Sequence, residues 1–441
     1  MHYTSTRDQS LSASLETALR TGIAPDGGLY VPASLPRFDT ERMDRAASLA
    51  ECGLQLLAPF FDGSTLAEVL DPICREALDL PAPIVELDAA ARILSLELWH
   101  GPTAAFKDFA ARFLAGCMAR LRRPEDPPRT VLVATSGDTG AAVAAAFHRR
   151  SGFCVVILYP DGRVSTRQAH QLGAFGDNIR AFRVQGDFDD CQRMVKALLS
   201  DPDSANRHGL TSANSISIGR LLPQIAYYAH AALRLGDSGF SDGNSPATFD
   251  VVVPTGNLGN ALACVLAREL GFPIGTIYLA TNANRTLPDY FDGHDYRGRP
   301  GLQTLANAMD VGDPSNFERL AWLFRDRDLR AVGIEARAFD DGRIRSGIRR
   351  AFEDFGKALC PHSACALEYA RDLRQSGHDR PLLLIETAHA AKFETVVEPI
   401  IGQTVPVPPA LAELLQRPSH AEALAPNPTA LSAALEAMLE N

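Results

Sequence analysis

The sequence predicts an α/β fold, and three observations support this prediction. Short apolar segments alternate with helical segments over most of the chain. Several apolar segments are continuous rather than alternating, as strands buried on both faces are. Strands that alternate with helices form parallel sheets covered by helices. The chain has 441 residues, which is more than one hydrophobic core usually supports, so we expect several domains.

The expected strands and helices define where a ligand should bind. The strands are expected at residues 93–98, 130–134, 154–159, 179–184, 249–253, 276–280 and 382–385. Helices are expected at residues 104–121, 140–149 and 259–270. Ligands of such sheets bind at the carboxyl ends of the strands. We therefore looked for reactive and polar residues directly after each apolar segment.

The first ninety residues differ from the rest of the chain and predict a mainly helical N-terminal domain. Helical periodicity covers residues 43–60 and 66–78, and the proline-containing segment 80–83 then ends the unit. Within it, residues 25–28 read as a turn before a short apolar run. Much later, the glycine- and serine-rich stretch 235–247 reads as a surface loop.

Composition excludes several classes of function. The hydrophobic fraction of 46% indicates a globular protein, and the net charge of -10 argues against binding to nucleic acid. No apolar run is long enough for a bilayer, and the N-terminus lacks the apolar region of a secretory signal. The eight cysteines form no C-x-x-C pair. We therefore expect free thiols, no metal site, no membrane contact and a cytoplasmic location.

The segment 100–109 contains the strongest candidate for a catalytic residue, Lys107. A lysine in a helix is most often a solvated surface residue. This lysine, however, follows a predicted strand and is flanked by Phe106, Phe109 and alanines. Apolar surroundings disfavour the ammonium and lower the pKa of a lysine. A lysine with a lowered pKa is suited to forming a Schiff base.

Two glycine-containing turns between a strand and a helix are candidate anion sites. Residues 134–140 and 253–260 both offer free N–H groups at the start of a helix. The first could equally be an N-cap turn in which Asp138 or Thr139 caps the helix. The second matches neither the P-loop pattern nor the G-x-G-x-x-G pattern, so nucleotide binding is not supported.

Two further segments complete the set of candidates. Residues 210–220 bring hydroxyl groups, an amide and Arg220 together before a helix, which suits a phosphate dianion; a capped helix start with a surface arginine is the alternative. Residues 384–393 place Thr387 at the end of the last apolar segment. Within them, His389 is more simply read as a structural histidine than as a base. Together the segments predict one site with an activated lysine and three anion-binding places.

These motifs resemble those of the threonine synthases, in their longer form with an N-terminal domain. The likeness covers nearly the whole chain and is carried by residues 25–32, 100–109, 135–140, 212–220, 307–311 and 387–389. The resemblance implies fold type II of the pyridoxal-phosphate (PLP) enzymes, the tryptophan synthase beta-like kind. It implies two parallel-sheet domains: a large PLP-binding domain (residues 91–108 with 225–441) and a small domain (109–224). The N-terminal domain would span 1–90, and the active site would lie at the domain interface.

The resemblance also implies a role for each candidate residue. Lys107 would be the catalytic residue and would hold PLP as a Schiff base. The cofactor phosphate would bind Gly256, Asn257, Leu258, Gly259 and Asn260. Thr387 would meet the pyridine nitrogen, and Asp138 the 3′-oxygen. Ser136 and Thr139, with Gly137, would bind the substrate carboxylate, and Asn214, Ser215 and Arg220 the substrate phosphate.

The implied reaction converts O-phospho-L-homoserine and water to L-threonine and phosphate, the last step of threonine biosynthesis. A monomer or weak homo-oligomer is expected. Two residues depart from the family pattern, Leu258 for phenylalanine and Ala390 for proline. The alternatives are a dehydratase or phospho-lyase on the same fold, acting on a hydroxy- or phospho-amino acid, or a non-catalytic binding protein on a degenerate enzyme fold. The orientation of Glu386 does not follow from the sequence.

Overall fold

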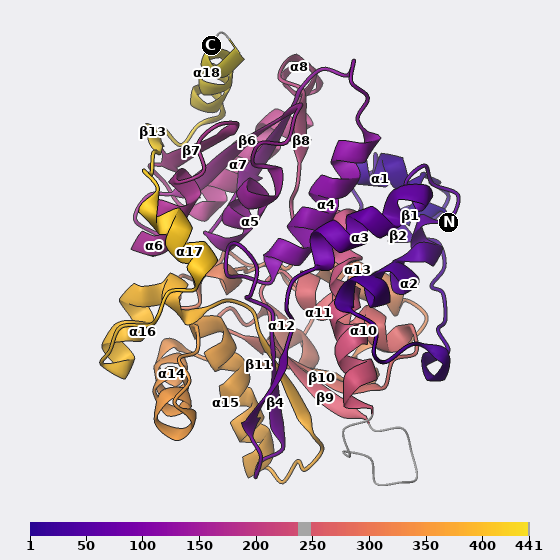
Figure 1. Cartoon of the computed structure of the whole chain (residues 1–441), viewed down its shortest axis with the longest axis vertical. Coiled ribbons are helices and arrows are strands. Elements are labelled where there is room, and N and C mark those ends of the chain that lie inside the picture. Colours follow the sequence, from indigo (N-terminus) through magenta and orange to yellow (C-terminus); the bar gives the residue numbers. More distant parts are fainter. Residues whose placement is uncertain (237–247, 440–441) are drawn as a thin grey trace.

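The computed structural model describes residues 1–236 and 248–439, so most of the predicted loop 235–247 lies outside the described residues. All seven predicted strands are present. They are β4 (Ile93–Glu97), β5 (Arg129–Ala134), β6 (Phe153–Pro160), β7 (Ile179–Val184), β9 (Phe249–Pro254), β10 (Ile274–Thr281) and β12 (Leu382–Glu386). They divide between two sheets, with the smaller sheet above the larger one in Figure 1.

The larger sheet has the order β11-β10-β9-β12-β4-β3. Its strands pair in parallel, except that the edge strand β3 (Ile84–Asp88) pairs antiparallel with β4. The expectation of purely parallel sheets is corrected at this edge. A short turn joins β3 to β4, and only antiparallel strands can be joined so closely. The other edge strand, β11 (Ile334–Ala338), was not predicted.

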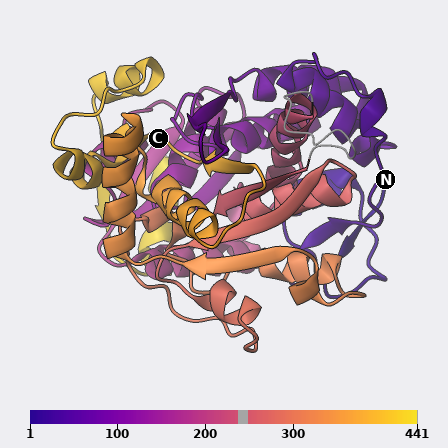
Figure 2. The same ribbon diagram turned by 90° about the horizontal axis from the view of Figure 1, so that it is seen from below.

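Both faces of the larger sheet are buried, which explains its continuous apolar strands. Along β9 and β12, Val251, Val253 and Leu383 pack into one core, and the intervening Val252 and Leu384 pack into another. Successive side chains of a strand point to opposite faces. Helix α11 (Gly259–Glu269) contributes to the first core and α15 (Pro361–Gln375) to the second. Figure 2 shows the larger sheet enclosed between helices in this way.

The smaller sheet is parallel and has the order β13-β7-β6-β5-β8. Two of its strands were not predicted, the short edge strands β8 (Leu210–Ser212) and β13 (Glu422–Leu424). β13 lies far along the chain from the other strands, beyond β12. It is followed by α18 (Pro428–Leu439), which packs with α7 (Phe188–Ser200) on one face of this sheet.

The N-terminal region is not purely helical, which corrects a second expectation. The strands β1 (Tyr3–Ser5) and β2 (Tyr30–Pro32) form a small antiparallel sheet beside α1 (Leu15–Thr21), α2 (Leu49–Phe61) and α3 (Leu70–Leu78). The predicted turn at residues 25–28 leads into β2, and an Asp26 carboxylate oxygen accepts hydrogen bonds from Ser5 and from the Gly28 amide. These helices lie along one side of the molecule (Figure 1).

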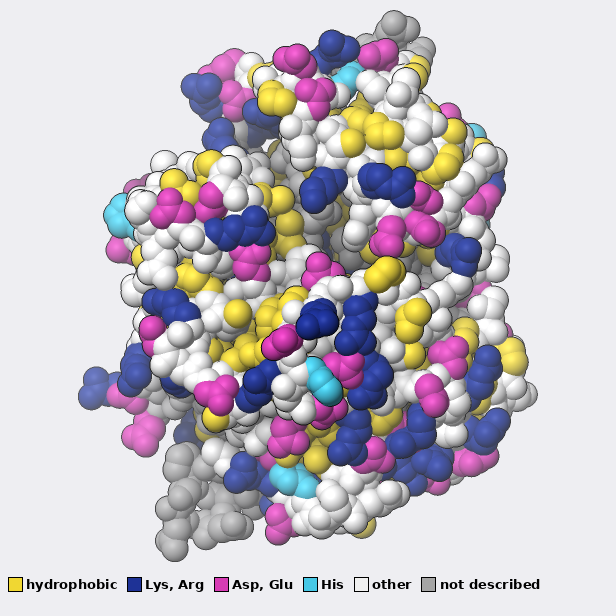
Figure 3. All heavy atoms as spheres, turned by 180° about the vertical axis from the view of Figure 1, so that it is seen from behind, with side chains coloured by type: hydrophobic (Ala, Val, Ile, Leu, Met, Phe, Trp, Pro, Cys, Tyr) yellow, Lys and Arg dark blue, Asp and Glu magenta, His cyan; other side chains and the backbone are white. Residues whose placement is uncertain are grey.

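The remaining helices surround the two sheets. They are α4 (Lys107–Leu121), α5 (Asp138–Phe147), α6 (Thr166–Gly173), α8 (Pro202–Arg207), α9 (Ile218–Leu221), α10 (Gln224–Leu235), α12 (Thr286–Phe291), α13 (Phe317–Leu323), α14 (Asp341–Phe355), α16 (Glu394–Ile401) and α17 (Pro409–Gln416). Short 3₁₀ helices include η3 (Asn307–Met309) and η5 (Ala390–Phe393). Within residues 1–236 and 248–439, no helix is long and apolar enough to cross a membrane. Basic and acidic side chains are interspersed over the face seen in Figure 3, so this face offers no uniform basic patch.

Candidate active site

One cavity of about 1510 Å³ is lined by all but one of the residues to which the sequence assigned a cofactor- or substrate-binding role; Gly137 is not part of the lining. These residues reach it from separate turns, each at the carboxyl end of a strand or the start of a helix. The lining includes Lys107, Ser136, Asp138, Thr139, Asn214, Ser215, Arg220, Gly256, Asn257, Leu258, Gly259, Asn260 and Thr387. The parallel strands thus bring to one place residues that are far apart in the sequence.

Lys107 is the first residue of α4 and projects from a turn that is tied to the end of β12. The Phe106 amide donates a hydrogen bond to the Thr387 carbonyl over 2.8 Å. The Lys107 Nζ lies 4.4 Å from the centre of the Phe106 ring. Burial, aided by the nearby Lys392 and Arg220 and opposed by Asp138, lowers the pKa of Lys107 to about 8. The structure therefore supports a reactive amine at this position.

A second buried lysine, Lys392, stands beside Lys107 and was not singled out from the sequence. Only 1% of it is exposed, and its Nζ lies 2.8 Å from the Asp138 Oδ1 and donates to the Thr103 carbonyl over 2.8 Å. Burial alone would raise the pKa of Asp138, but Lys392, Lys107 and His362 hold it well below its usual range. Asp138 is therefore an anion fixed between cations. The flanks of Lys392, Ala391 and Phe393, are apolar like those of Lys107 and were the available signal.

The glycine loop before α11 has the shape of a phosphate cradle. A Cβ on Gly256 would lie 2.7 Å from the Met309 Cα, so a larger residue would displace the backbone. Leu258 has φ of +62°, and Gly259 begins the helix, so successive amides face the cavity. The Asn260 Oδ1 accepts hydrogen bonds from two tyrosine hydroxyls, and its buried Nδ2 has no partner among the described residues. The loop therefore fits the phosphate of the expected cofactor.

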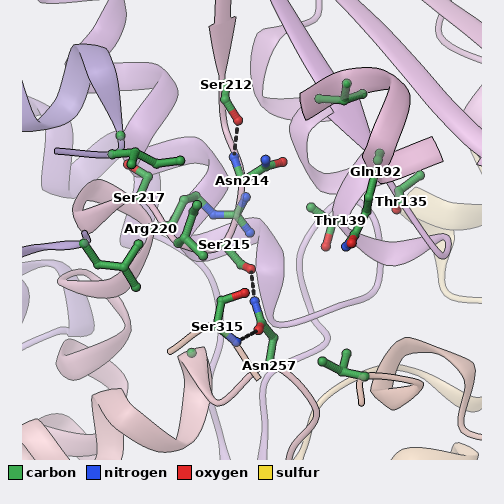
Figure 4. A pocket seen from close by; sticks show the side chains of 18 of the residues that line it. Thr135, Thr139, Gln192, Ser212, Asn214, Ser215, Ser217, Arg220, Asn257 and Ser315 are labelled. Carbon is green, nitrogen blue, oxygen red and sulfur yellow. Dashed lines mark hydrogen bonds between the residues drawn. The ribbon is translucent and has the colours of Figure 1, made fainter. Parts of the chain in front are cut away.

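Arg220 is a buried cation, which contradicts the alternative of a surface arginine. Only 2% of it is exposed, and its Nη1 donates to the Ala213 carbonyl over 2.7 Å. Its Nε has no hydrogen-bond partner, and no carboxylate pairs with it, within the described part of the chain. Burial lowers the pKa of Arg220 to about 10, so it remains a cation. In Figure 4 its guanidinium lies close to the side chains of Asn214 and Ser215, an arrangement that could bind a second anion.

Three residues at the end of β12 differ in their position relative to the cavity. Thr387 lines it, whereas Glu386 and His389 do not. Glu386 does not line the cavity: its Oε2 accepts a hydrogen bond from the Trp99 Nε1 over 3.0 Å, and its Oε1 lies 2.5 Å from the Lys357 Nζ. His389 is neutral, because burial lowers its pKa to about 4, and its Nδ1 accepts from the Ala391 amide. The reading of His389 as a structural histidine agrees with these contacts.

The structure adds a neutral histidine, His362, which the sequence analysis missed. Its Nε2 accepts a hydrogen bond from the Ala308 amide over 3.1 Å, and burial lowers its pKa to about 4. The single ring proton is therefore on Nδ1. That nitrogen has no partner among the described residues, and His362 lines the cavity. His362 lies at the start of α15, outside every segment that the sequence analysis proposed as part of the site.

Three family models match the chain in consecutive or overlapping segments. The model of the pyridoxal-phosphate dependent enzymes matches residues 77–387. The model of the threonine synthase N terminus matches residues 2–78, and that of the threonine synthase C-terminal region matches residues 363–435.

Individual relatives agree with these models. Threonine synthase from Escherichia coli is 36% identical over 93% of this chain and 94% of the relative. Its crystal structure superposes with a TM-score of 0.88 over 99% of this chain and all of that one, at 35% identity. The structure of PLP-bound threonine synthase from Brucella melitensis has a TM-score of 0.89 at 32% identity, over 99% of both chains. These matches show that the chain belongs to the threonine synthase family of PLP-dependent enzymes.

Proposed function

We propose that this cavity converts O-phospho-L-homoserine and water to L-threonine and phosphate, the last step of threonine biosynthesis. The observation that supports this substrate most directly is the second anion site. Among the described residues, no carboxylate pairs with the buried Arg220, which does not belong to the glycine loop. The phosphate of PLP requires one anion site and the substrate carboxylate another, at the start of α5, so a substrate that carries its own phosphate accounts for the third.

The site residues are assigned the roles that the family resemblance implies, and their position around one cavity supports this assignment. The amides of Gly256 to Asn260 would hold the cofactor phosphate, Thr387 would hydrogen-bond the pyridine nitrogen, and Asp138 would bind the 3′-oxygen. Ser136 and Thr139, at the start of α5, hold the substrate carboxylate, and Asn214, Ser215 and Arg220 hold the substrate phosphate. When bound, PLP supplies the electron sink that makes loss of a proton from the substrate carbon possible.

Lys107 is the base of the proposed reaction. Its Nζ takes the proton from the substrate Cα and, once that proton has been passed on, takes the proton from Cβ, so that phosphate can leave from Cγ. A proton then returns to Cγ, which becomes the methyl group, water adds at Cβ, and a proton returns to Cα. A pKa of about 8 makes an appreciable fraction of neutral amine available near neutral pH. Arg220 stabilises the leaving phosphate through a charge-assisted contact made in a desolvated place.

The organisation of the chain remains part of the proposal. We assign residues 1–90 to an N-terminal domain, 91–108 with 225–441 to a large domain and 109–224 to a small domain. The segment 422–439 departs from these bounds: β13 pairs with β7 and α18 packs with α7, so this segment belongs to the small domain rather than to the large one. We propose a cytoplasmic enzyme that is a monomer or a weak homo-oligomer.

The decisive experiment follows products from phosphohomoserine. Equal amounts of threonine and inorganic phosphate are expected; a keto acid would indicate a phospho-lyase instead. Arg220→Ala should lower kcat/KM by about two to three decades, because losing one partner of a buried charge pair costs about 2–5 kcal/mol. Dehydration of serine, which has no phosphate, should change far less. An equal loss with both substrates would assign Arg220 another role and favour a dehydratase.

A further inference from the structure

The two anion sites of the cavity are joined by one side chain, that of Asn257. Its backbone belongs to the glycine loop, and its Nδ2 lies 3.0 Å from the Ser215 Oγ of the second site. Figure 4 shows this contact, with Ser215 between Asn257 and Arg220. The backbones also approach closely, because a Cβ on Gly259 would lie 3.9 Å from the Ser215 carbonyl oxygen.

The direction of the hydrogen bond between Asn257 and Ser215 is determined by a third residue. The backbone amide of Ser315 donates to the Asn257 side chain over 2.6 Å. An amide N–H can only donate, so the atom that it meets is the Asn257 oxygen, and the atom that faces Ser215 is the nitrogen. The Asn257 nitrogen can only donate in turn. The Ser215 hydroxyl is therefore the acceptor, and its own proton is free for another partner.

A hydroxyl that accepts one hydrogen bond becomes a stronger donor of the next. Within the described part of the chain, the Ser215 Oγ has no second hydrogen-bond partner. We propose that Asn257 is a positioning residue: it turns the Ser215 proton toward the phosphate of the substrate, so that the cofactor-binding loop assembles the substrate-phosphate site. This inference rests on the proposed function of the second anion site.

The Asn257 backbone is itself held by a chain of buried contacts. The Asn316 Nδ2 donates to the Asn257 carbonyl over 2.9 Å, and Asn316 is fully buried. The Asn316 Oδ1 accepts from the Arg319 Nη1 over 2.9 Å, and the Arg319 Nε donates to the Tyr30 carbonyl in β2 over 3.0 Å. Only 1% of Arg319 is exposed. The N-terminal strand therefore supports the position of Asn257 through two side chains.

The test measures the binding of inorganic phosphate to the holoenzyme by isothermal titration calorimetry. Asn257→Ala should weaken binding about tenfold, because a hydrogen bond to a charged group loses its orientation. Asn257→Asp has the same shape and can still accept from Ser315, but its second oxygen makes Ser215 donate to it. The Ser215 hydroxyl can then only present its lone pairs to the phosphate, which both they and the introduced carboxylate repel. Asn257→Asp should therefore weaken binding more than Asn257→Ala, by about a hundredfold.

Three further variants make the test specific. Adding Asn257→Ala to Ser215→Ala should cause no further loss, because Asn257 acts through Ser215. Ser315→Ala keeps the backbone amide that contacts Asn257 and should bind phosphate like the wild type. The absorbance of bound cofactor is recorded for every variant, and phosphate affinities are compared at saturating PLP. In steady-state assays the loss should appear mainly in KM for phosphohomoserine.

Two outcomes have distinct meanings. If Arg220→Ala weakens phosphate binding while Asn257→Asp binds it like the wild type, the inference about Asn257 is wrong and the proposed substrate stands. If Arg220→Ala also leaves phosphate binding unchanged, the second anion site itself is wrong, and the proposed function fails with it.

Discussion

Replacing Lys392 by methionine tests whether the buried Asp138–Lys392 pair sets the reactivity of Lys107. The substitution removes the cation that pairs with Asp138, of which only 3% is exposed. Among the described residues, the Gln168 side-chain amide, which donates over 3.1 Å, then remains as its hydrogen-bond partner. Breaking a buried ion pair in this way costs about 3–5 kcal/mol, which urea unfolding can measure. The exposed Lys196 on α7 provides the control, since Lys196→Met should change stability by less than about 0.5 kcal/mol.

The same substitution should change the titration of Lys107. Lys392 is one of the charges that lower the pKa of Lys107 to about 8, and Asp138 opposes them. Without Lys392, the repulsion between its charge and the Lys107 ammonium is lost, while the attraction of Asp138 remains. The pKa of Lys107 should therefore rise by about one unit. At pH 7.5 the neutral fraction, and with it the rate of covalent attachment of PLP to the apoenzyme, should fall about tenfold. The rate is followed by cofactor absorbance over pH 6.5–10.5. A Lys392→Met protein with unchanged stability and an unchanged pH midpoint would refute the reasoning.

Three other outcomes are expected. Lys107→Ala should lose the visible absorbance of bound cofactor and nearly all turnover; a variant that keeps both would exclude Lys107 as the anchor. Gly256→Ala places a Cβ 2.7 Å from the Met309 Cα, so PLP affinity measured by dialysis should fall at least about tenfold, since a shifted backbone misplaces the phosphate-binding amides. Unfolded protein should titrate as eight free thiols, and the folded protein should react slowly, because burial raises the pKa of Cys52, Cys74 and Cys191 to about 12. Fewer thiols in reduced preparations would reveal a disulfide.

The local pattern of apolar residues predicted those strands whose two faces are both buried. β9 and β12 were expected as continuous apolar segments, and both of their faces are covered by helices. The strands missed are β1, β3, β8, β11 and β13, and each of them is short or partly exposed. An edge strand has one paired side, so its sequence carries a weaker apolar signal and its pairing depends on residues distant in the chain. The antiparallel direction of β3 has a local cause, since the turn that joins it to β4 is too short for a parallel connection.

For the residues of the cavity as well, some features were predicted from local sequence and others depend on the tertiary structure. Glycines at 256 and 259 and a lysine with apolar flanks at 107 are local signals, because close backbone approach and desolvation require those residue types wherever they occur. Arg220 and His389 had two readings each in the sequence, and burial bears on both: Arg220 is enclosed, with no carboxylate partner among the described residues, and the contacts of the buried, neutral His389 agree with a structural role.

The sequence by itself determined the α/β alternation, the turns after the strands and the apolar surroundings of Lys107. Only the tertiary structure decided which polar groups meet. Lys392 pairs with Asp138 from the other end of the chain, and His362 turns an unpartnered nitrogen to the same cavity. Asn257 reaches Ser215, and Arg319 reaches Tyr30, across elements that no local pattern connects. Hydrogen bonds and ion pairs act over about 3 Å, so the folding of separate segments to within that distance creates them.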